Sequence, residues 1–318
     1  YYLSLGYANR EGTVVGRGYE NFRGRINVDS YVTKWLTVGV NAQYAARNSG
    51  WLSADVTQRK HLSPYAPNDI DDPESAYRHY PNGNNNCINP FYDNHFIDRR
   101  SWNYDLSANI YAKVALPFGI EYQFNLSPRQ HLYEYYNHKS DEHESWAGNG
   151  GESERTVNNS LNWQIDNILK WNKSFGQNRF DITLLQNAEK NRLWSTTAQN
   201  KKYSPNDVLS YHAIHSGSEP TVSSNDTYST GDALMARVFY SYADKYMLTA
   251  SVRRDGYSAF GQKNPRATFP SIALGWVFSN EKFMERAGWL DFGKLRVSYG
   301  INGNRDIGIY AALAQLST

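Results

Sequence analysis

Three segments in the last quarter of the sequence decide its fold class: YMLTASVRRDGYSAFG (246–261), RATFPSIALGWVFS (266–279) and KLRVSYGINGN (294–304). Each alternates apolar and polar residues with a period of two, so that Leu248, for example, lies on the face opposite Arg253. The segments are about ten residues long, which a tilted strand needs to cross a bilayer, whereas strands of soluble sandwiches average about five to six. Their aromatic residues lie near the segment ends, as in the girdles of membrane barrels. The pattern predicts the wall of a membrane β-barrel.

The composition of the 318-residue chain supports this interpretation. It is 15% aromatic, with 25 Tyr and 9 Trp, yet its mean hydropathy is −0.70. A barrel with a polar lumen, polar loops and a thin apolar outer band has such a composition, whereas a soluble protein more often builds its core from Leu, Ile and Val. The net charge of +2, without a cluster of Lys and Arg, excludes an electrostatic case for nucleic-acid binding.

The sequence excludes several other classes of protein. No apolar run approaches the roughly 18 residues of a transmembrane helix. The single cysteine, Cys87, excludes an internal disulfide and a four-cysteine zinc site, and no motif calls for a cofactor. The chain has no initial Met and no signal peptide, and it opens within strand-like sequence. We interpret it as part of a longer protein.

Alternation recurs along the whole chain and predicts about eleven antiparallel strands. Two kinds of connection follow each other, short turns at 33–34, 116–118, 172–178 and 244–245, and long loops at 48–100, 128–154 and 194–230. Short turns at one end and long loops at the other are typical of all-β, up-and-down outer-membrane barrels. Because an odd number of strands cannot close such a ring, we expect about half of a larger transmembrane barrel.

Four segments are similar to barrel strands of the SusC/RagA-like family of TonB-dependent outer-membrane transporters of Bacteroidota: YYLSLGYANREGTVVGRGYENFRGRINVDSYVTKWLTVGVN (1–41), DKYMLTASVRRDGYSAFG (244–261), FPSIALGW (269–276) and LRVSYGINGNRDIGIY (295–310). Together they span both ends of the chain. Family members usually read closer to RRDGSSRFG, so Tyr257 and Ala259 depart from the family at two positions that we expect in a loop.

The resemblance implies that residues 1–318 are part of a barrel of about 22 strands, without its signal peptide, plug domain and C-terminal strands. It further implies the outer membrane of a Gram-negative bacterium, contact with its lipid, and energy-coupled import of an oligosaccharide or a peptide. The implied protein partners are a SusD-like surface lipoprotein, which acts as a lid, and TonB, which acts through the plug.

Aromatic residues of the predicted long loops are candidates for ligand binding. A sugar ring presents apolar C–H faces and a rim of hydroxyl groups, and Tyr and Trp offer a large, rigid apolar face with a polar tip. The alternative is that each of them packs within its loop or belongs to the aromatic girdle. The candidates are Trp51, Tyr65, Tyr77, Trp146, Trp194 and Tyr203.

Five arginines are predicted on the lumen side of strands. They could guide a polar substrate or hold the plug through ion pairs. We favour contact with the wall and the plug, because an arginine on a buried face generally needs a carboxylate partner. These residues are Arg23, Arg25, Arg237, Arg253 and Arg296.

Two kinds of loop sequence carry candidate metal ligands. An acidic run offers the oxygen ligands that calcium prefers, but it lacks the spacing of an EF-hand. Two histidine-containing motifs lack a recognisable zinc scaffold. We therefore interpret both as solvated loop residues and expect no metal site. The acidic residues are Asp69, Asp71, Asp72 and Glu74, and the motifs are HKSDEHE (138–144) and YHAIH (211–215).

Two other functions are alternatives to import. A soluble β-rich glycan-binding module would cover the apolar face of its strands with a second sheet, and it would leave the alternation of short and long turns unexplained. An outer-membrane barrel enzyme would need a nucleophile and a base, and no Ser/His/Asp arrangement in the sequence has a supporting motif. We therefore predict an importer and not an enzyme.

Overall fold

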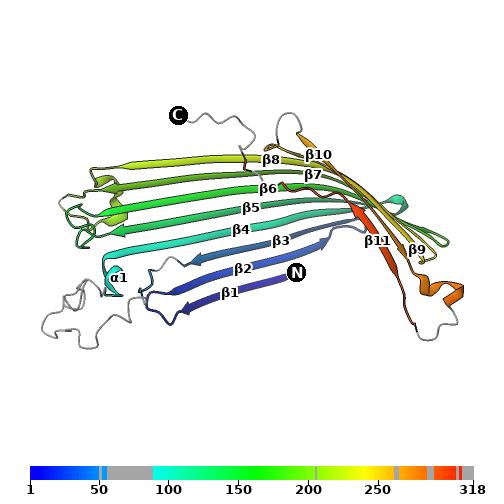
Figure 1. Cartoon of the computed structure of the whole chain (residues 1–318), viewed down its shortest axis with the longest axis horizontal. Coiled ribbons are helices and arrows are strands. Elements are labelled where there is room, and N and C mark those ends of the chain that lie inside the picture. The colour runs from blue at the N-terminus through cyan, green and yellow to red at the C-terminus, as the bar shows by residue number, and fades with distance from the viewer. Residues whose placement is uncertain are drawn as a thin grey trace.

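The described residues form one antiparallel sheet of eleven strands (Figure 1). The computed structural model describes residues 1–49, 52–55, 89–204, 206–260, 265–284, 290–305 and 308–309. No helix in this part of the chain is long and apolar enough to cross a membrane. The strands are β1 (Tyr2–Glu11), β2 (Gly18–Tyr31), β3 (Leu36–Asn48), β4 (Ile97–Leu116), β5 (Ile120–Lys139), β6 (Glu152–Phe175), β7 (Asn178–Lys201), β8 (Thr221–Tyr242), β9 (Tyr246–Tyr257), β10 (Arg266–Trp276) and β11 (Leu295–Gly300). The helical turns are α1 (Tyr92–Phe96), η3 (Pro117–Gly119), η4 (Ser210–Ser216), η5 (Phe278–Asn280) and η6 (Lys282–Met284).

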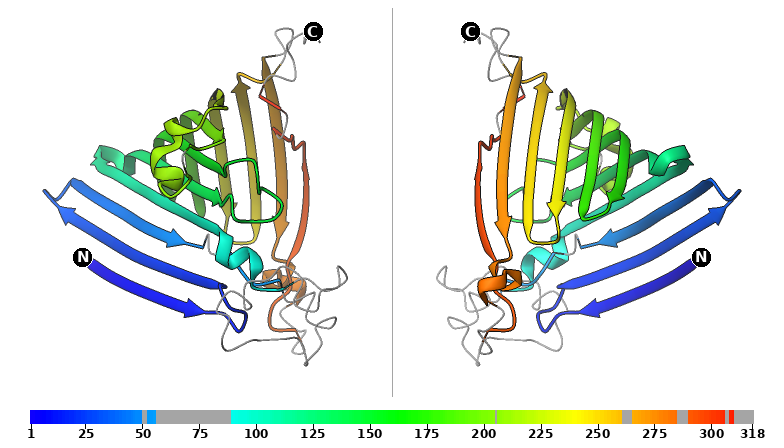
Figure 2. Two further views of the ribbon diagram at one scale, coloured as in Figure 1. Left: turned by 90° about the vertical axis from the view of Figure 1, so that its left-hand side faces the viewer. Right: turned by 90° about the vertical axis from the view of Figure 1, so that its right-hand side faces the viewer.

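The strands follow one another across the sheet in the order of the sequence, from β1 to β11. This is the up-and-down arrangement that the alternation and the turns predicted, so the all-β fold and the strand number are confirmed. β1 and β11 are the two edges, and Figure 2 shows the sheet bending round between them. The described residues thus form an open section of a barrel wall, and closure with about 22 strands stays a prediction.

The register gives the sheet two different faces, because directly paired residues point to the same side. On one face a row of apolar side chains runs across β3 to β6 through the pairs Val40–Ile110, Ile110–Leu126 and Leu126–Ile165. We call this side the apolar face. The neighbouring row on the other side, the polar face, is made of polar residues through the pairs that link Asn125, Asp166 and Asn187.

The apolar face carries an aromatic row at the end with the short turns. The ring centroids of Trp171 and Phe180 are 6.4 Å apart, and those of Phe180 and Tyr240 are 4.9 Å apart. From Phe180 to Ala188 on β7, every residue that points to the apolar face is itself apolar, with one exception. We call this side of the wall the outward side. Eight residues of strand cover about 27 Å, close to the roughly 25 Å apolar band of outer-membrane barrels. We call this region the apolar band.

The central strands are longer than the sequence predicted. β4 to β8 have 20 to 24 residues each, and 24 residues of strand extend for about 80 Å. The predicted loops 128–154 and 194–230 therefore shrink to 140–151 and 202–220. The reason is that water lies on both sides of a strand beyond the bilayer, so its residues need not alternate. The segment that opens β8, TVSSNDTYST, is polar on both faces yet fully paired with β7.

The strict alternation of short turns and long loops is also wrong at two connections. The turns 117–119, 176–177 and 243–245 lie at the right-hand end of Figure 1, and the connections at 140–151 and 202–220 lie at the left-hand end. However, the long connection 277–294 starts at the short-turn end, where Val277 N donates to Lys245 O at 2.8 Å. At the opposite end, the connection between β1 and β2 is the short segment 12–17.

A close approach between neighbouring strands gives a test of this packing. The Tyr111 ring crosses over Gly39, its partner on β3, and its hydroxyl donates a hydrogen bond to Asp29 on β2. A Cβ atom on Gly39 would lie 2.3 Å from Tyr111 Cζ. We expect Gly39→Leu to displace the ring and to lower the free energy of unfolding by about 1–3 kcal/mol, the usual cost of overpacking.

The measurement is the temperature at which the folded protein loses its fast-migrating band on a denaturing gel without boiling. Gly6→Ala is the control, since a Cβ atom on Gly6 meets no atom within 4 Å. Equal transition temperatures for Gly39→Leu and the unsubstituted protein would contradict the packing.

Candidate functional site

The five arginines predicted to face the lumen all lie on the polar face. Arg237 is paired with Ser251, which is paired with Ser271. Arg296 is paired with Gly275. It lies two positions along β11 from Ser298, which is paired with Ala273, and residues two apart point to the same side of a strand. Arg23 and Arg25 are paired with Ala45 and Gln43 of β3, and these two residues of β3 point to the polar face. All five therefore lie on the polar face of the sheet, and that this face lines a lumen stays a prediction.

Four of these arginines lack a carboxylate partner among the described residues. Only Arg253 has one, because its Nε donates to Asp255 Oδ1 at 2.7 Å. Other cations of the polar face are paired, for example Lys170 with Glu121 at 3.5 Å. Unpaired guanidinium groups in a confined lumen attract carboxylates and polar ligands. Contact with a plug stays a prediction for Arg23, Arg25, Arg237 and Arg296.

The predicted ligand-binding aromatics do not form one group. Trp146 lies in the loop 140–151, where its ring centroid is 4.2 Å from that of His143 and 4.8 Å from Lys139 Nζ. Trp194 lies in β7 and not in a loop, on the apolar side of the wall, with Arg192 Cζ 3.9 Å from its ring centroid. Its predicted loop position is wrong, because β7 continues beyond the band.

Tyr203 is buried rather than open to a ligand. Only 6% of its surface is exposed, and its ring lies edge-on to that of His138 with centroids 6.4 Å apart. Its backbone N donates to Gly150 O at 2.9 Å, which joins its loop to the loop of Trp146. Burial raises the pKa of the Tyr203 hydroxyl. The other three candidates, Trp51, Tyr65 and Tyr77, lie outside the described residues.

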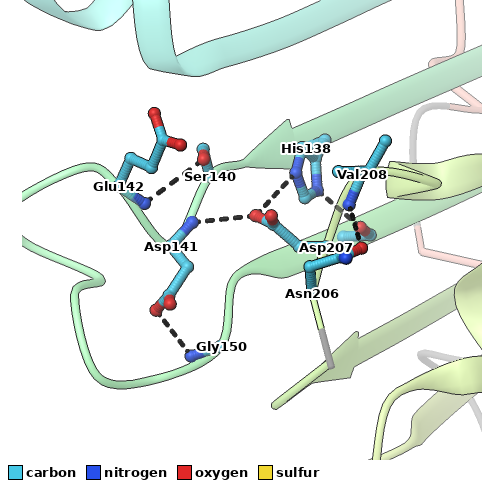
Figure 3. Close-up of polar contacts among 9 residues, drawn as sticks. His138, Ser140, Asp141, Glu142, Gly150, Asn206, Asp207 and Val208 are labelled. Atoms are coloured by element: carbon cyan, nitrogen blue, oxygen red, sulfur yellow. Dashed lines mark hydrogen bonds and ion pairs between the residues drawn. The ribbon is translucent and has the colours of Figure 1, made fainter. Parts of the chain in front are cut away.

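The two loops at 140–151 and 202–220 are joined by a network of polar groups around Asp207 (Figure 3). Its Oδ2 accepts a hydrogen bond from the backbone N of Asp141 at 2.8 Å and lies 3.1 Å from His138 Nε2. The other ring nitrogen of His138 contacts Ser153 Oγ at 2.8 Å. Asp141 in turn accepts from Gly150 N at 2.8 Å. We call these five residues the loop clamp.

The loop 202–220 lies against the outward side of the wall beyond the apolar band. Tyr211 of η4 stacks on Tyr136 at 5.4 Å and donates to Asp98 Oδ2 at 2.9 Å. Asn200 Nδ2 donates to Ile214 O at 2.8 Å and to Gly217 O at 2.9 Å. Tyr136, Asp98 and Asn200 share the parity of the apolar face. This loop therefore covers the outside of the strands and not the polar face.

No group of three or more His, Cys, Asp or Glu side chains in the described ranges is placed to hold a metal ion. His138 is engaged with Asp207, and His143 Nε2 lies 3.1 Å from Asp93 Oδ1. His212 packs on the ring of Tyr211 at 4.6 Å. The acidic residues Asp69, Asp71, Asp72 and Glu74 lie outside the described residues. His138 and Asp207 are 69 residues apart, so no local motif in the sequence indicates the loop clamp.

No protein-family model matches the chain. TonB-dependent receptor P3 of Formosa agariphila is 29% identical over 335 residues, which cover 100% of this chain and 33% of the relative. TonB-dependent receptor P39 of the same species is 28% identical over 319 residues, 99% of this chain and 30% of the relative. TonB-dependent receptor SusC of Bacteroides thetaiotaomicron is 24% identical over 362 residues, 97% of this chain and 32% of the relative.

The fold is also shared with a solved transporter. A chain of the RagAB peptide transporter superposes with a TM-score of 0.82 at 22% identity, over 97% of this chain and 36% of that chain. The chain is similar in sequence to TonB-dependent receptors, SusC among them, and it shares the fold of a RagAB transporter chain. The resemblance of the four quoted segments is thereby confirmed, and the similarity extends over 97–100% of this chain. The chain spans about a third of the length of the curated relatives that it matches.

The loop clamp gives a pH-dependent prediction. Burial lowers the pKa of His138 below the 6.5 that is usual for a histidine, against the opposing effect of the Asp207 carboxylate. The opened loop then binds more protons than the closed loop, so the clamp is fully stable above pH 6.5 and loses stability as the pH falls through the lowered pKa. We expect hydrogen exchange at 140–151 and 202–220, corrected for intrinsic rates, to show more opening at pH 5 than at pH 8. An unchanged degree of opening would contradict a buried neutral His138, and His138→Gln should abolish the dependence.

Removal of the Asp207 carboxylate gives a second test. Asp207→Ala leaves the buried His138 ring and the Asp141 amide without their acceptor, at a cost of about 1–3 kcal/mol for each unsatisfied group. We therefore expect proteolytic cleavage in both loops to accelerate at least tenfold. Glu142→Ala is the matched control, because Glu142 is exposed in the same loop and its carboxylate points away from the clamp (Figure 3). Equal cleavage rates for the two variants would show that the clamp does not hold the loops.

Proposed function

We propose that the chain is the central wall of a TonB-dependent importer in the outer membrane of a Gram-negative bacterium. The observation that carries this proposal is the similarity to proteins named TonB-dependent receptors over 97–100% of the chain. The two faces of the sheet fit the same function, since an apolar band suits lipid and a polar face suits an aqueous lumen.

The imported ligand is proposed to be an oligosaccharide or a peptide. One relative is SusC, and a protein with the same fold is named a peptide transporter. The polar face offers amides, hydroxyl groups and the unpaired guanidinium groups of Arg23, Arg25 and Arg237, which suit either class of ligand. A SusD-like surface lipoprotein is the proposed lid, and TonB acts through a plug domain. The activity proposed is transport and not catalysis.

The alternative of a soluble glycan-binding module requires a second sheet over the apolar face. Among the described residues all eleven strands belong to one sheet, and large side chains of the apolar face stay exposed, such as Leu184 at 46%, Leu234 at 57% and Leu274 at 56%. Burying an exposed leucine against lipid or protein contributes about 1.5–3 kcal/mol. The apolar face therefore favours lipid as its neighbour.

The experiment that tests the proposal uses the full-length protein in its native host. We expect it to fractionate with the outer membrane, to need detergent for extraction, and to migrate faster on denaturing gels before boiling. Uptake of labelled digests of polysaccharide or of casein should stop when the proton gradient is collapsed. Recovery as a detergent-free soluble monomer would refute the membrane assignment, and uptake that is insensitive to the gradient would refute TonB coupling.

The unpaired arginines give a separate prediction. If they bind the plug, replacing Arg23 and Arg25 by Gln should loosen it and admit small antibiotics that are normally excluded by the outer membrane, with little change in barrel stability. If they bind substrate, the same variant should raise the KM of uptake without increased antibiotic entry. Arg179→Gln is a control on the same face, because Arg179 is paired with Asp181 at 3.3 Å within its own strand.

A further inference from the structure

The polar face of β1 to β5 has a strong excess of positive charge on the long-loop side of the apolar band. The edge of the band is a row of directly paired residues that crosses the sheet. Beyond this row, the polar-face positions of the five strands hold seven Lys or Arg residues and one carboxylate, that of Asp105. The row consists of Ala188, Ile165, Leu126, Ile110, Val40 and Val28. The cations are Arg10, Arg23, Arg25, Arg47, Arg99, Arg129 and Lys139.

Only two of the seven cations are balanced within the wall. The Asp105 carboxylate accepts a hydrogen bond from Arg47, and its other oxygen lies 2.7 Å from His131 Nδ1. Lys139 Nζ lies 2.8 Å from Glu152 Oε1 of β6. The other five cations have no carboxylate partner among the described residues, so their charge is available to a ligand. They are Arg10, Arg23, Arg25, Arg99 and Arg129.

Three of these five arginines lie close to one another on the wall. Arg25 and Arg129 belong to the same row, because the pairs continue from Arg25 through Gln43 and Ser107 to Arg129. Three strand spacings separate them, which is about 14 Å along the sheet. Arg23 lies two positions along β2 from Arg25, at about 7 Å. All three side chains are exposed. Each guanidinium group can therefore meet its own anionic group, as it would on a chain that carries several charges.

Two tyrosines next to Arg129 offer a flat aromatic surface on the same face. Tyr133 and Tyr135 follow Arg129 along β5, and their rings are inclined by only 13° with centroids 6.4 Å apart. Tyr133 is paired with Asn158 of β6, whose Oδ1 accepts a hydrogen bond from Ser195 at 2.6 Å. A sugar ring can pack its apolar C–H face on a tyrosine while its hydroxyl groups reach neighbouring polar groups. The two rings therefore suit sugar units.

We propose that this part of the polar face binds an acidic oligosaccharide, a sugar chain whose units carry carboxylate or sulfate groups. Arg23, Arg25 and Arg129 bind the anionic groups, for which the guanidinium fork is well shaped, and Tyr133 and Tyr135 pack against the sugar rings. A neutral sugar chain would leave the arginines without a counter-charge. A run of Asp and Glu residues in a peptide would balance the charge but offers no ring face to the tyrosines. The inference rests on the proposed import function, since it names the class of ligand.

The test measures binding of a fluorescent oligogalacturonate and of a chondroitin sulfate oligosaccharide to the full-length transporter in a non-ionic detergent. We expect at least one of them to bind roughly tenfold more tightly than a maltooligosaccharide of the same length. Added salt should weaken this binding. Each exposed ion pair contributes a factor of about two to five in affinity, so Arg23→Gln/Arg25→Gln/Arg129→Gln should weaken it by about ten- to a hundredfold. Tyr133→Ala/Tyr135→Ala should weaken it as well.

The matched control removes three positive charges from the opposite face at the same end of the wall. Arg100, Lys190 and Arg192 are paired with Tyr136, Trp163 and Leu161, which lie on the outward side beyond the band. Arg100→Gln/Lys190→Gln/Arg192→Gln should therefore change the affinity by less than about twofold. The heat-dependent gel shift confirms that each variant is folded.

Four results would overturn the proposal. They are equal affinity for the neutral chain, equal affinities of the two triple variants, tighter binding of a polyglutamate peptide than of both acidic oligosaccharides, and entry of antibiotics into cells that carry Arg23→Gln/Arg25→Gln/Arg129→Gln. The last result would assign the arginines to the plug. These outcomes remain separate from those for the proposed function. A transporter whose uptake depends on the proton gradient but which prefers the neutral chain refutes the ligand class alone.

Discussion

Lateral pairing of the backbone is the constraint on which the rest of this structure depends. Inside a bilayer each unpaired N–H or C=O group costs several kcal/mol, so a strand can cross only when both of its sides are paired. Here the strands from β2 to β10 are paired on both sides with their neighbours in sequence. Once the ladder is set, the parity of each residue decides which face it occupies. The register between strands then joins these choices into continuous surfaces.

The same ladder continues where the membrane cannot help to stabilise it. Beyond the apolar band β4 to β8 continue as a paired ladder, and the loop 202–220 lies along part of their outward side. Polar contacts between strands also hold this part of the sheet. Glu152, for example, contacts Lys139 Nζ at 2.8 Å and Lys201 Nζ at 3.0 Å, which joins β5, β6 and β7. The loop clamp and the contacts of Asn200 act in the same way, so the outer ends of the strands are held by loops that lie along them.

Alternation in the sequence was enough to predict the strand number and the up-and-down order. It failed where its physical cause is missing. The residues 221–230 are mainly polar on both faces of β8, so no apolar parity marks them as a strand and the sequence predicts a loop there. The same error put Trp194 in a loop. The loop clamp was beyond prediction for another reason, because Asp207 meets His138 only after the intervening hairpin has brought the two loops together.

The adjacent residues Arg253 and Arg254 show how far parity decides the chemistry of one motif. They have the same side chain and follow each other in the sequence RRDG, yet they point to opposite sides of β9. Arg253 meets Asp255, two positions along the same face, and its charge is neutralised within the wall at 2.7 Å. Arg254 has only Gly256 two positions along its face, and no carboxylate of the described residues reaches it. The same dipeptide therefore places one neutralised arginine on the polar face and, on the apolar face, one arginine without a carboxylate partner among the described residues.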